Sequence, residues 1–207
     1  MNQVADILQL AFDARQQHVD AVLATVVRTE GSAYRKPSAM MLICEDGRSV
    51  GMISGGCLEP HIIKRAFWLT RHGASVQVYQ TGDEQKEDLE DELEEKLDND
   101  AIDFAVDLED ELNFGLGCNG KVHVLFERLS SAMPYLDLIQ KVRQNGESTT
   151  VATLIRSNSS EVTVGTRVHL NASFLDDNKN SQEIPEQTTN LPKPIIDELS
   201  AYKVSNK

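Results

Sequence analysis

Two short loops combine glycine with cysteine, and these are the residues best suited to chemistry in this sequence. The first covers residues 54–57, with the sequence Ser-Gly-Gly-Cys, and the second covers residues 115–120, with the sequence Gly-Leu-Gly-Cys-Asn-Gly. Glycine permits backbone conformations in which consecutive N–H groups converge, and this arrangement binds anions such as phosphate. Cysteine adds a soft sulfur that acts as a nucleophile or as a metal ligand.

The first loop leads into a predicted helix over residues 57–72, and Pro60 is acceptable there only in the first turn. A helix N-terminus offers unpaired N–H groups and about half a positive charge, which favour a bound phosphate and stabilise a thiolate at Cys57. Arg35 and Arg48 are near in sequence and would add bidentate contacts to an anion. The simpler alternative is that the glycines only permit tight turns.

The second loop matches the dinucleotide pattern G-x-G-x-x-G, but its context excludes that function. The dinucleotide fingerprint follows a buried strand and opens a helix. Here an acidic stretch comes before the loop and a predicted strand over residues 121–127 comes after it. We therefore expect Cys118 to lie in a glycine turn without a helix, and no Rossmann site at this loop.

The remaining cysteine and the N-terminal residues indicate a cytoplasmic protein. Cys44 lies inside a predicted strand, where it is expected to be a buried apolar residue. Three cysteines in total argue against a disulfide framework. The first residues lack the features of a signal peptide, and no apolar stretch approaches the roughly 20 residues that span a bilayer.

The charge is concentrated in one segment. The formal net charge is −13, which would repel nucleic acid, so we expect no nucleic-acid partner. Residues 83–111 hold 16 acidic residues against two lysines, which leaves the rest of the chain close to neutral. We predict a solvated insertion at residues 83–113 that forms no part of the core. A docking arm for a basic partner surface is the alternative.

The remaining pattern predicts an α/β (or α+β) fold, with one domain over residues 1–172 and a linker or tail over residues 173–207. The domain would contain a mixed, mainly buried β-sheet flanked by helices. The helices are expected over residues 2–17, 57–72 and 131–144. The strands are expected over residues 21–28, 39–45, 49–54, 75–80, 121–127, 149–156 and 162–170.

Several motifs in order resemble the N-terminal domain of the XdhC/CoxI family of xanthine dehydrogenase and carbon monoxide dehydrogenase accessory proteins. They are Ala-Thr-Val-Val at residues 24–27, Gly-Ser-Ala-Tyr-Arg at 31–35, Asp-Gly-Arg at 46–48, Ser-Gly-Gly-Cys-Leu-Glu at 54–59, and the second loop at 115–120. The resemblance covers roughly residues 20–130. The chain departs from the family in Ser38, where glycine is usual, in the long acidic insertion, and in lacking the usual second half, a Rossmann domain.

The resemblance implies a chaperone that binds molybdenum cofactor transiently and assists its sulfuration or its insertion into a molybdoenzyme such as xanthine dehydrogenase. It implies no catalytic residue, and it makes Cys57 and Cys118 the ligands of the metal. The implied cofactor-binding residues are Ser54, Gly55, Gly56, Cys57, Glu59, Arg35, Gly117, Cys118, Asn119 and Gly120.

Two other functions stay open at this point. One is a thiol-dependent sulfurtransferase that carries a persulfide on Cys57 and accepts sulfur from a cysteine desulfurase. The other is a regulatory interaction module that binds no cofactor. Expected partners are a molybdoenzyme and, as open alternatives, a desulfurase and a second copy of this chain.

Overall fold

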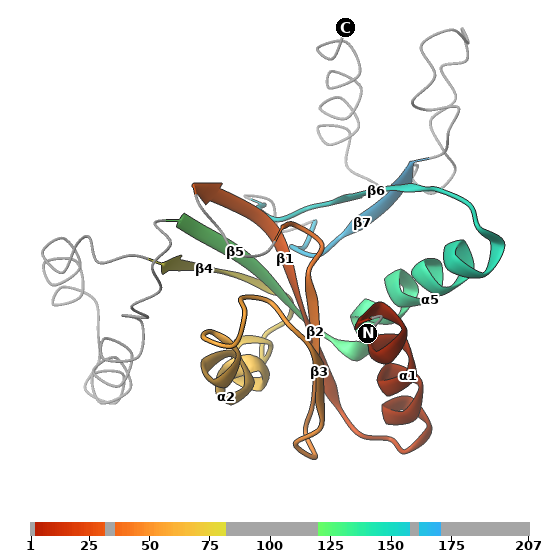
Figure 1. Ribbon diagram of the computed structural model, residues 1–207, viewed down its shortest axis with the longest axis horizontal. Coiled ribbons are helices and arrows are strands. Elements are labelled where there is room, and N and C mark those ends of the chain that lie inside the picture. Colours follow the sequence, from red (N-terminus) through yellow and green to blue (C-terminus); the bar gives the residue numbers. More distant parts are fainter. Residues whose placement is uncertain (1–2, 32–35, 82–119, 158–161, 171–207) are drawn as a thin grey trace, which may run out of the picture. The chain divides into compact units, whose positions relative to one another are not determined.

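The computed structural model describes residues 3–31, 36–81, 120–157 and 162–170 (Figure 1). The chain divides into two compact units, with the boundary between Leu129 and Ser130. The sequence predicted a single domain over residues 1–172, and this boundary stays a prediction. The acidic insertion and the predicted tail lie outside the described residues.

The first unit alternates strands with two helices in its described part. Its elements are α1 (Gln3–Gln16), β1 (Ala21–Gly31), β2 (Met40–Cys44), β3 (Ser49–Gly51), α2 (Glu59–Leu69), β4 (Ser75–Thr81) and β5 (Gly120–Arg128). The predicted α/β class is confirmed, and each element overlaps the range predicted for it. The strand predicted over residues 49–54 ends early, at Gly51, whose φ of +99° turns the chain out of the sheet.

The five strands form one sheet in the order β3-β2-β1-β5-β4, and every neighbouring pair is antiparallel. The predicted sheet was mixed, so the strand directions differ from that prediction. The reason lies in the path of α2, which connects β3 at one edge to β4 at the other. The two strands joined by this helix run in the same direction, but they are not neighbours.

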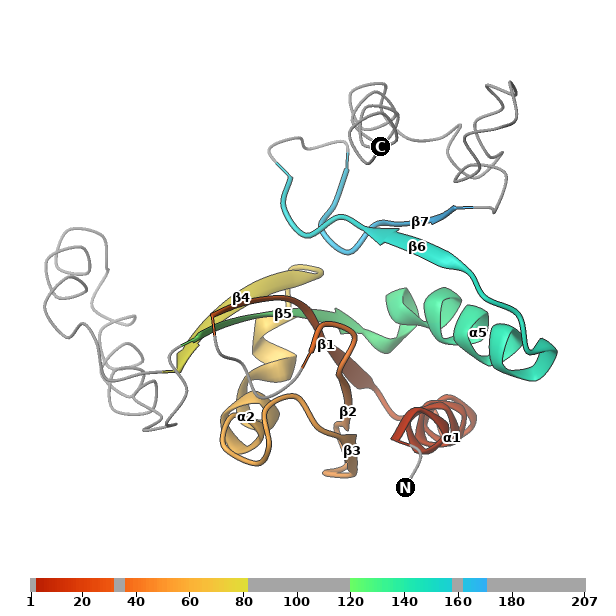
Figure 2. The same cartoon turned by 45° about the horizontal axis from the view of Figure 1, so that its top comes forward.

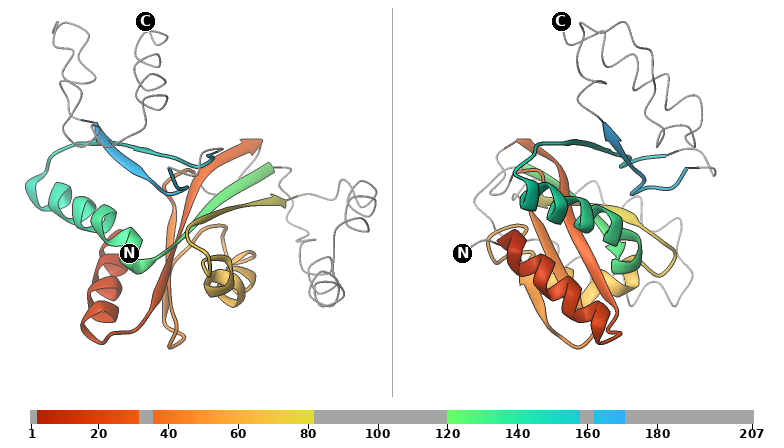
Figure 3. Two further views of the ribbon diagram at one scale, coloured as in Figure 1. Left: turned by 180° about the vertical axis from the view of Figure 1, so that it is seen from behind. Right: turned by 90° about the vertical axis from the view of Figure 1, so that its right-hand side faces the viewer.

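Helices cover both sides of the sheet, because α2 packs against β1 and β5 while α1 packs against β2 and β3. In Figure 1, and from behind in Figure 3, α1 and α2 lie on opposite sides of β2. Residues 21–26 of β1 are all buried. On the α2 side, alternate residues of the strands pack with the helix in one apolar cluster, whose buried members are Val22, Ala24, Val26, Met41, Ile43, Ile53, Leu58, Ile62, Ala66, Tyr79, Val122, Val124 and Phe126. Burial of each large apolar side chain contributes roughly 1.5–3 kcal/mol.

The segments that contain the two glycine–cysteine loops and Arg35 all start from one end of this sheet. Because the strands are antiparallel, β1, β3 and β4 end where β2 and β5 begin. Gly31 pairs with Gly120, and Gly120 pairs with Thr81 on its other side. Segments 32–39, 52–58 and 82–119 therefore all start from this end of the sheet.

The acidic insertion connects two strands that pair directly with each other. The strand pair β4–β5 is regular from Ser75 opposite Phe126 to Thr81 opposite Gly120. Thr81 and Gly120, the residues that flank segment 82–119, are consequently paired on adjacent strands. That placement fits the prediction that the acidic residues form no part of the core, which stays a prediction.

The second unit contains one helix and one strand pair in its described part. Helix α5 (Leu129–Asn145) begins at the boundary, and β6 (Thr150–Thr153) pairs antiparallel with β7 (Arg167–Leu170), as Figure 2 shows. Both strands are shorter than the sequence predicted. Within this unit the Arg167 guanidinium lies 4.2 Å from the ring centre of Tyr135. Throughout the described residues, no helix is long and apolar enough to cross a bilayer.

Candidate functional site

The first glycine–cysteine loop runs from Ile53 to Leu58 and joins the end of β3 to the start of α2. Helix α2 begins at Glu59, two residues later than the sequence predicted, and Pro60 lies in its first turn. The loop has a buried base, formed by Ile53, Ser54 and Leu58. Gly55 and Gly56 are exposed and have φ values of +139° and +118°, which only glycine adopts without strain.

The carboxylate of Glu59 is the acceptor for the converging N–H groups of this loop. Its Oε1 accepts hydrogen bonds from the backbone N–H of Ile53 (2.9 Å), Ser54 (2.7 Å) and Gly55 (3.4 Å). Its Oε2 accepts from the Ser54 hydroxyl (2.6 Å) and the N–H of Gly56 (2.9 Å). The anion-binding loop that the sequence predicted therefore exists, and the anion it holds is the chain's own side chain.

The hydroxyl of Ser54 ties the two ends of the loop together. It donates to Glu59 and accepts a hydrogen bond of 3.0 Å from the N–H of Leu58, the residue before the first turn of α2. That contact satisfies one of the N–H groups that a helix start leaves unpaired. The loop is thus closed by the side chains of Ser54, within it, and of Glu59, the residue that follows it.

These hydrogen bonds keep Glu59 ionised although it is buried. Burial alone would raise the pKa of this carboxyl. The Ser54 hydroxyl and the N–H groups of Ser54 and Ile53 outweigh that effect and lower the pKa of Glu59 to about 2. The carboxylate is therefore a permanent negative charge at neutral pH, stabilised by backbone donors and by the N-terminus of α2.

Cys57 is exposed and is a free thiol. Of residues 53–59, it carries the only exposed side chain, because the two other exposed residues are glycines. Cys44 behaves in the opposite way: it is buried in β2, as the sequence predicted. Burial, together with the nearby Asp46 carboxylate, raises the pKa of Cys44, so this thiol is kept neutral.

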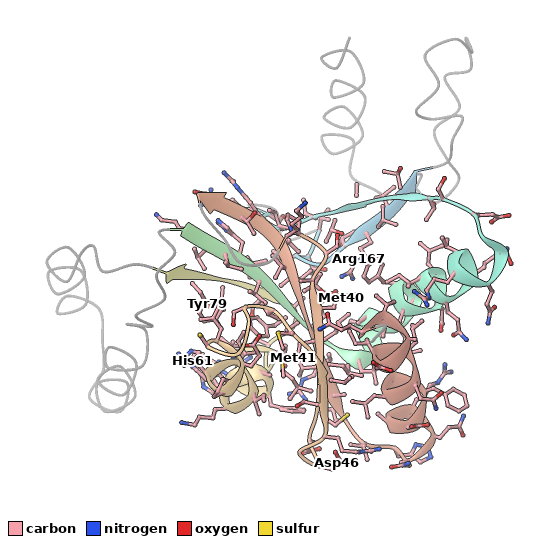
Figure 4. The ribbon with its side chains drawn as sticks, in the orientation of Figure 1. Met40, Met41, Asp46, His61, Tyr79 and Arg167 are labelled. Carbon is pink, nitrogen blue, oxygen red and sulfur yellow. The ribbon has the colours of Figure 1, made fainter. Side chains whose placement is uncertain are left out.

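The start of α2 packs against β4 through two ring side chains. His61 and Tyr79 are both buried, with ring centres 5.8 Å apart in an edge-to-face arrangement, and they lie together in Figure 4. Arg65 approaches His61 at 3.5 Å. Burial raises the pKa of Tyr79 to about 12, against the opposing effect of the Arg65 charge. This cluster was not predicted, since nothing in the spacing of these residues links β4 to α2.

The His61–Tyr79 contact joins the first turn of α2 to β4 near the end of that strand. Tyr79 pairs with Val122, and two residues further along Thr81 pairs with Gly120, the last residue of the second motif. His61 follows Cys57 by four residues. Gly117, Cys118, Asn119 and Arg35 lie outside the described residues, so their predicted part in the site stays a prediction, as does the pairing of Cys57 with Cys118 around a metal.

Arg48 does not belong to this site, which corrects the sequence prediction. It lies in the Asp46–Arg48 turn between β2 and β3, at the opposite end of the sheet from Met40, and Figure 4 shows Asp46 at that far end. Its guanidinium bonds Asp46 Oδ2 at 2.7 Å and Gln17 at 2.9 Å. The prediction failed because nearness in sequence across a hairpin places residues at opposite strand ends.

A metal site composed of this chain's described side chains is not present. Among the described residues, no three His, Cys, Asp or Glu side chains gather closely enough to hold an ion. A metal held at Cys57 would need further ligands from the cargo or from residues outside the described ranges. The exposed thiol fits a soft metal centre, whereas the filled N–H groups beside it do not fit a second anion.

Residues 14–80 match the family model described as the XdhC and CoxI family. The resemblance to this family is confirmed. The matched range runs through β1, β2, β3 and α2, so it includes Glu59 and the whole loop from Ile53 to Leu58.

Two curated relatives match the chain in part, and the chain spans less than a third of the length of either. A Bacillus subtilis protein named as a probable xanthine dehydrogenase component is 37% identical over 113 residues, which are 54% of this chain and 27% of that protein. The molybdenum cofactor insertion chaperone PaoD of Escherichia coli is 45% identical over 53 residues, which are 26% of this chain and 17% of that protein. A crystal structure of a xanthine dehydrogenase from Bacillus halodurans has a TM-score of 0.49 and 27% identity, covering 78% of this chain and 41% of that one.

Proposed function

We propose that this chain is an accessory protein of a xanthine dehydrogenase-type molybdoenzyme, which holds molybdenum cofactor at Cys57 and assists its sulfuration or its insertion. The family match covers the Cys57 loop, and the two curated relatives are named for xanthine dehydrogenase and for molybdenum cofactor insertion. The match spans only 27% and 17% of those proteins, so the cargo and the partner are part of the proposal.

The observation that carries this proposal is the exposed Cys57 thiol on a loop that its own residues hold in place. A sulfur ligand suits a molybdenum–sulfur centre because both are soft, and a transient carrier needs a ligand that solvent and a partner can reach. Glu59 and Ser54 bond to both ends of the loop, so the thiol is presented by an ordered backbone. In this proposal, Cys57 binds the cargo, the loop orients it, and the molybdoenzyme receives it.

The chain performs no reaction of its own in this account. The second candidate is a sulfurtransferase, which the same exposed thiol favours. Cys57 would attack the persulfide of a cysteine desulfurase, take its outer sulfur, release the desulfurase thiol, and pass the sulfur on. The free state of Cys44 and Cys57 fits the cytoplasm, where both functions would take place.

Metal content separates the carrier from the other functions. Wild type, Cys57→Ser and Cys44→Ser would be purified anaerobically from a molybdenum-replete host, and molybdenum per chain measured by plasma mass spectrometry. We expect wild type and Cys44→Ser to retain molybdenum, and Cys57→Ser to contain at least tenfold less molybdenum per chain. Equal molybdenum in wild type and Cys57→Ser would contradict the proposal.

A single-turnover assay separates carrier from sulfurtransferase. Radiolabelled sulfur would be offered by a cysteine desulfurase, and label on the chain followed after rapid gel filtration. The carrier proposal expects no stoichiometric label on Cys57 in the absence of cofactor. One labelled sulfur per chain, lost in Cys57→Ser, would favour the sulfurtransferase instead.

A further inference from the structure

The backbone donors of the Cys57 loop are already occupied. Four N–H groups and one hydroxyl point at the two oxygens of Glu59, at distances of 2.6–3.4 Å. A carboxylate offers about four lone-pair positions, so these contacts use its full capacity. An external phosphate would reach the same N–H groups only by displacing a side chain that is buried and covalently attached to the next helix.

We propose that Glu59 is the resident anion of this loop: it excludes phosphate from the N–H groups of Ser54, Gly55 and Gly56, and it positions Cys57 as the ligand contact. This inference rests on the proposed function only for the nature of the cargo. It changes what the sequence predicted, because the glycines then serve the loop's own closure. The phosphate of a bound cofactor is held elsewhere.

Two independent features favour Glu59 over an external anion. A tethered carboxylate competes at an effective concentration in the millimolar range or higher, whereas free phosphate loses translational and rotational entropy on association. Glu59 is 9% exposed, and from the first turn of α2 its carboxylate contacts Ile53 and Ser54 of the buried loop base, so its removal opens that base. A ligand therefore meets the loop through the Cys57 side chain.

The direct test is to remove the resident anion and offer a substitute. Chemical unfolding of Glu59→Ala would be measured in formate and in inorganic phosphate, with chloride at equal ionic strength as reference. We expect a saturable stabilisation by formate: at ten times its Kd, the unfolding equilibrium constant falls about tenfold. Wild type should show no such saturable response to either anion. The matched control is Asp46→Ala, which removes a carboxylate from the exposed turn at the other end of β2 and should behave as wild type.

Two outcomes would overturn this inference: saturable phosphate stabilisation of wild type, or no anion response of Glu59→Ala. If Glu59→Ala does not fold in chloride, its refolding yield in formate is compared with that in chloride, and equal yields would contradict the inference in the same way.

A second measurement tests positioning, since a merely structural loss would not be reversed by an anion. The rate at which iodoacetamide alkylates Cys57 should differ between wild type and Glu59→Ala, and formate should return the Glu59→Ala rate to within about twofold of wild type. A rate unchanged by saturating formate would rule out the positioning role. None of these measurements involves molybdenum. They can therefore contradict the role of Glu59 while the proposed carrier function stands, and the carrier function can be wrong while the role of Glu59 stands.

Discussion

The β2–β3 hairpin has a glycine turn at one end and the Cys57 loop at the other, and the two use a carboxylate in different ways. Asp46 accepts a hydrogen bond of 3.1 Å from the N–H of Arg48 and pairs with its guanidinium at the surface, where the two side chains are 35% and 37% exposed. Glu59 is buried and depends on backbone N–H groups. Water can replace the hydrogen bonds of an exposed carboxylate but not those of a buried one. The Cys57 loop therefore depends on its carboxylate, whereas the Asp46–Arg48 turn does not.

The largest expected effect comes from the different space around the glycines at the two ends of the β2–β3 hairpin. A Cβ at Gly51 would lie 2.2 Å from the carbonyl oxygen of Met40 and 2.9 Å from Cα of Met41, while a Cβ at Gly47 would meet nothing within 4 Å. Both glycines have positive φ, +99° and +90°. We expect Gly51→Ala to lower the free energy of unfolding by roughly 3 kcal/mol or more, and Gly47→Ala by about 1 kcal/mol. Urea unfolding measures both, and equal losses would show that the close approach at Gly51 is relieved at no cost.

The next effect distinguishes the two carboxylates. Glu59→Gln keeps the shape but turns an amide NH₂ toward N–H and O–H donors, so we expect a loss of about 3 kcal/mol in the free energy of unfolding. Asp46→Asn should leave the midpoint of unfolding unchanged. Urea unfolding at pH 7 is the measurement. A Glu59→Gln variant as stable as wild type would mean that the loop does not need its anion.

The pH dependence follows from the low pKa of Glu59. Its folded value of about 2 lies below the ordinary 4.5, so this carboxylate stabilises the fold fully above pH 4.5. That contribution is lost as the pH falls from 4.5 toward 2, and we expect it to be on the order of 2 kcal/mol after allowance for water near the loop. The difference in unfolding free energy between wild type and Glu59→Gln should shrink over this interval. A difference that stays constant from pH 7 to pH 3 would contradict the assignment.

The smallest effect concerns Ser38, which has a φ of +77° where glycine is usual in the family. Its N–H donates to the carbonyl of Val26 at 2.8 Å, and this contact holds the turn in place before β2. Ser38→Gly relieves strain but adds freedom to the unfolded chain. We therefore expect a gain of between 0 and about 1 kcal/mol, measured by thermal unfolding. A clear loss would show that the Ser38 side chain makes a needed contact.

The apolar runs of the sequence were sufficient to predict the central strands and both helices of the first unit. Residues 21–26, apart from Thr25, and residues 40–44 are apolar and buried, and such runs are readable without any partner. The strand directions were not readable, because they depend on α2 crossing from one edge of the sheet to the other.

The role of Glu59 depended on a boundary that sequence patterns place only to within a few residues. With the helix starting at Cys57, the N–H groups of the glycines would be open to a ligand. With the start at Glu59, its carboxylate reaches back to Ile53 and fills them. The contact between His61 and Tyr79 was also hidden, since it joins residues from elements whose register the sequence does not reveal.

Protection of Cys57 by the cargo is the most direct test of the central claim that this thiol contacts molybdenum cofactor. Wild-type protein would be alkylated with iodoacetamide under anaerobic conditions, with and without purified molybdenum cofactor, and Cys57 and Cys44 quantified separately by peptide mass spectrometry. We predict that saturating cofactor slows alkylation of Cys57 at least tenfold and leaves the slow reaction of buried Cys44 unchanged. Equal alkylation rates of Cys57 with and without cofactor would contradict the account.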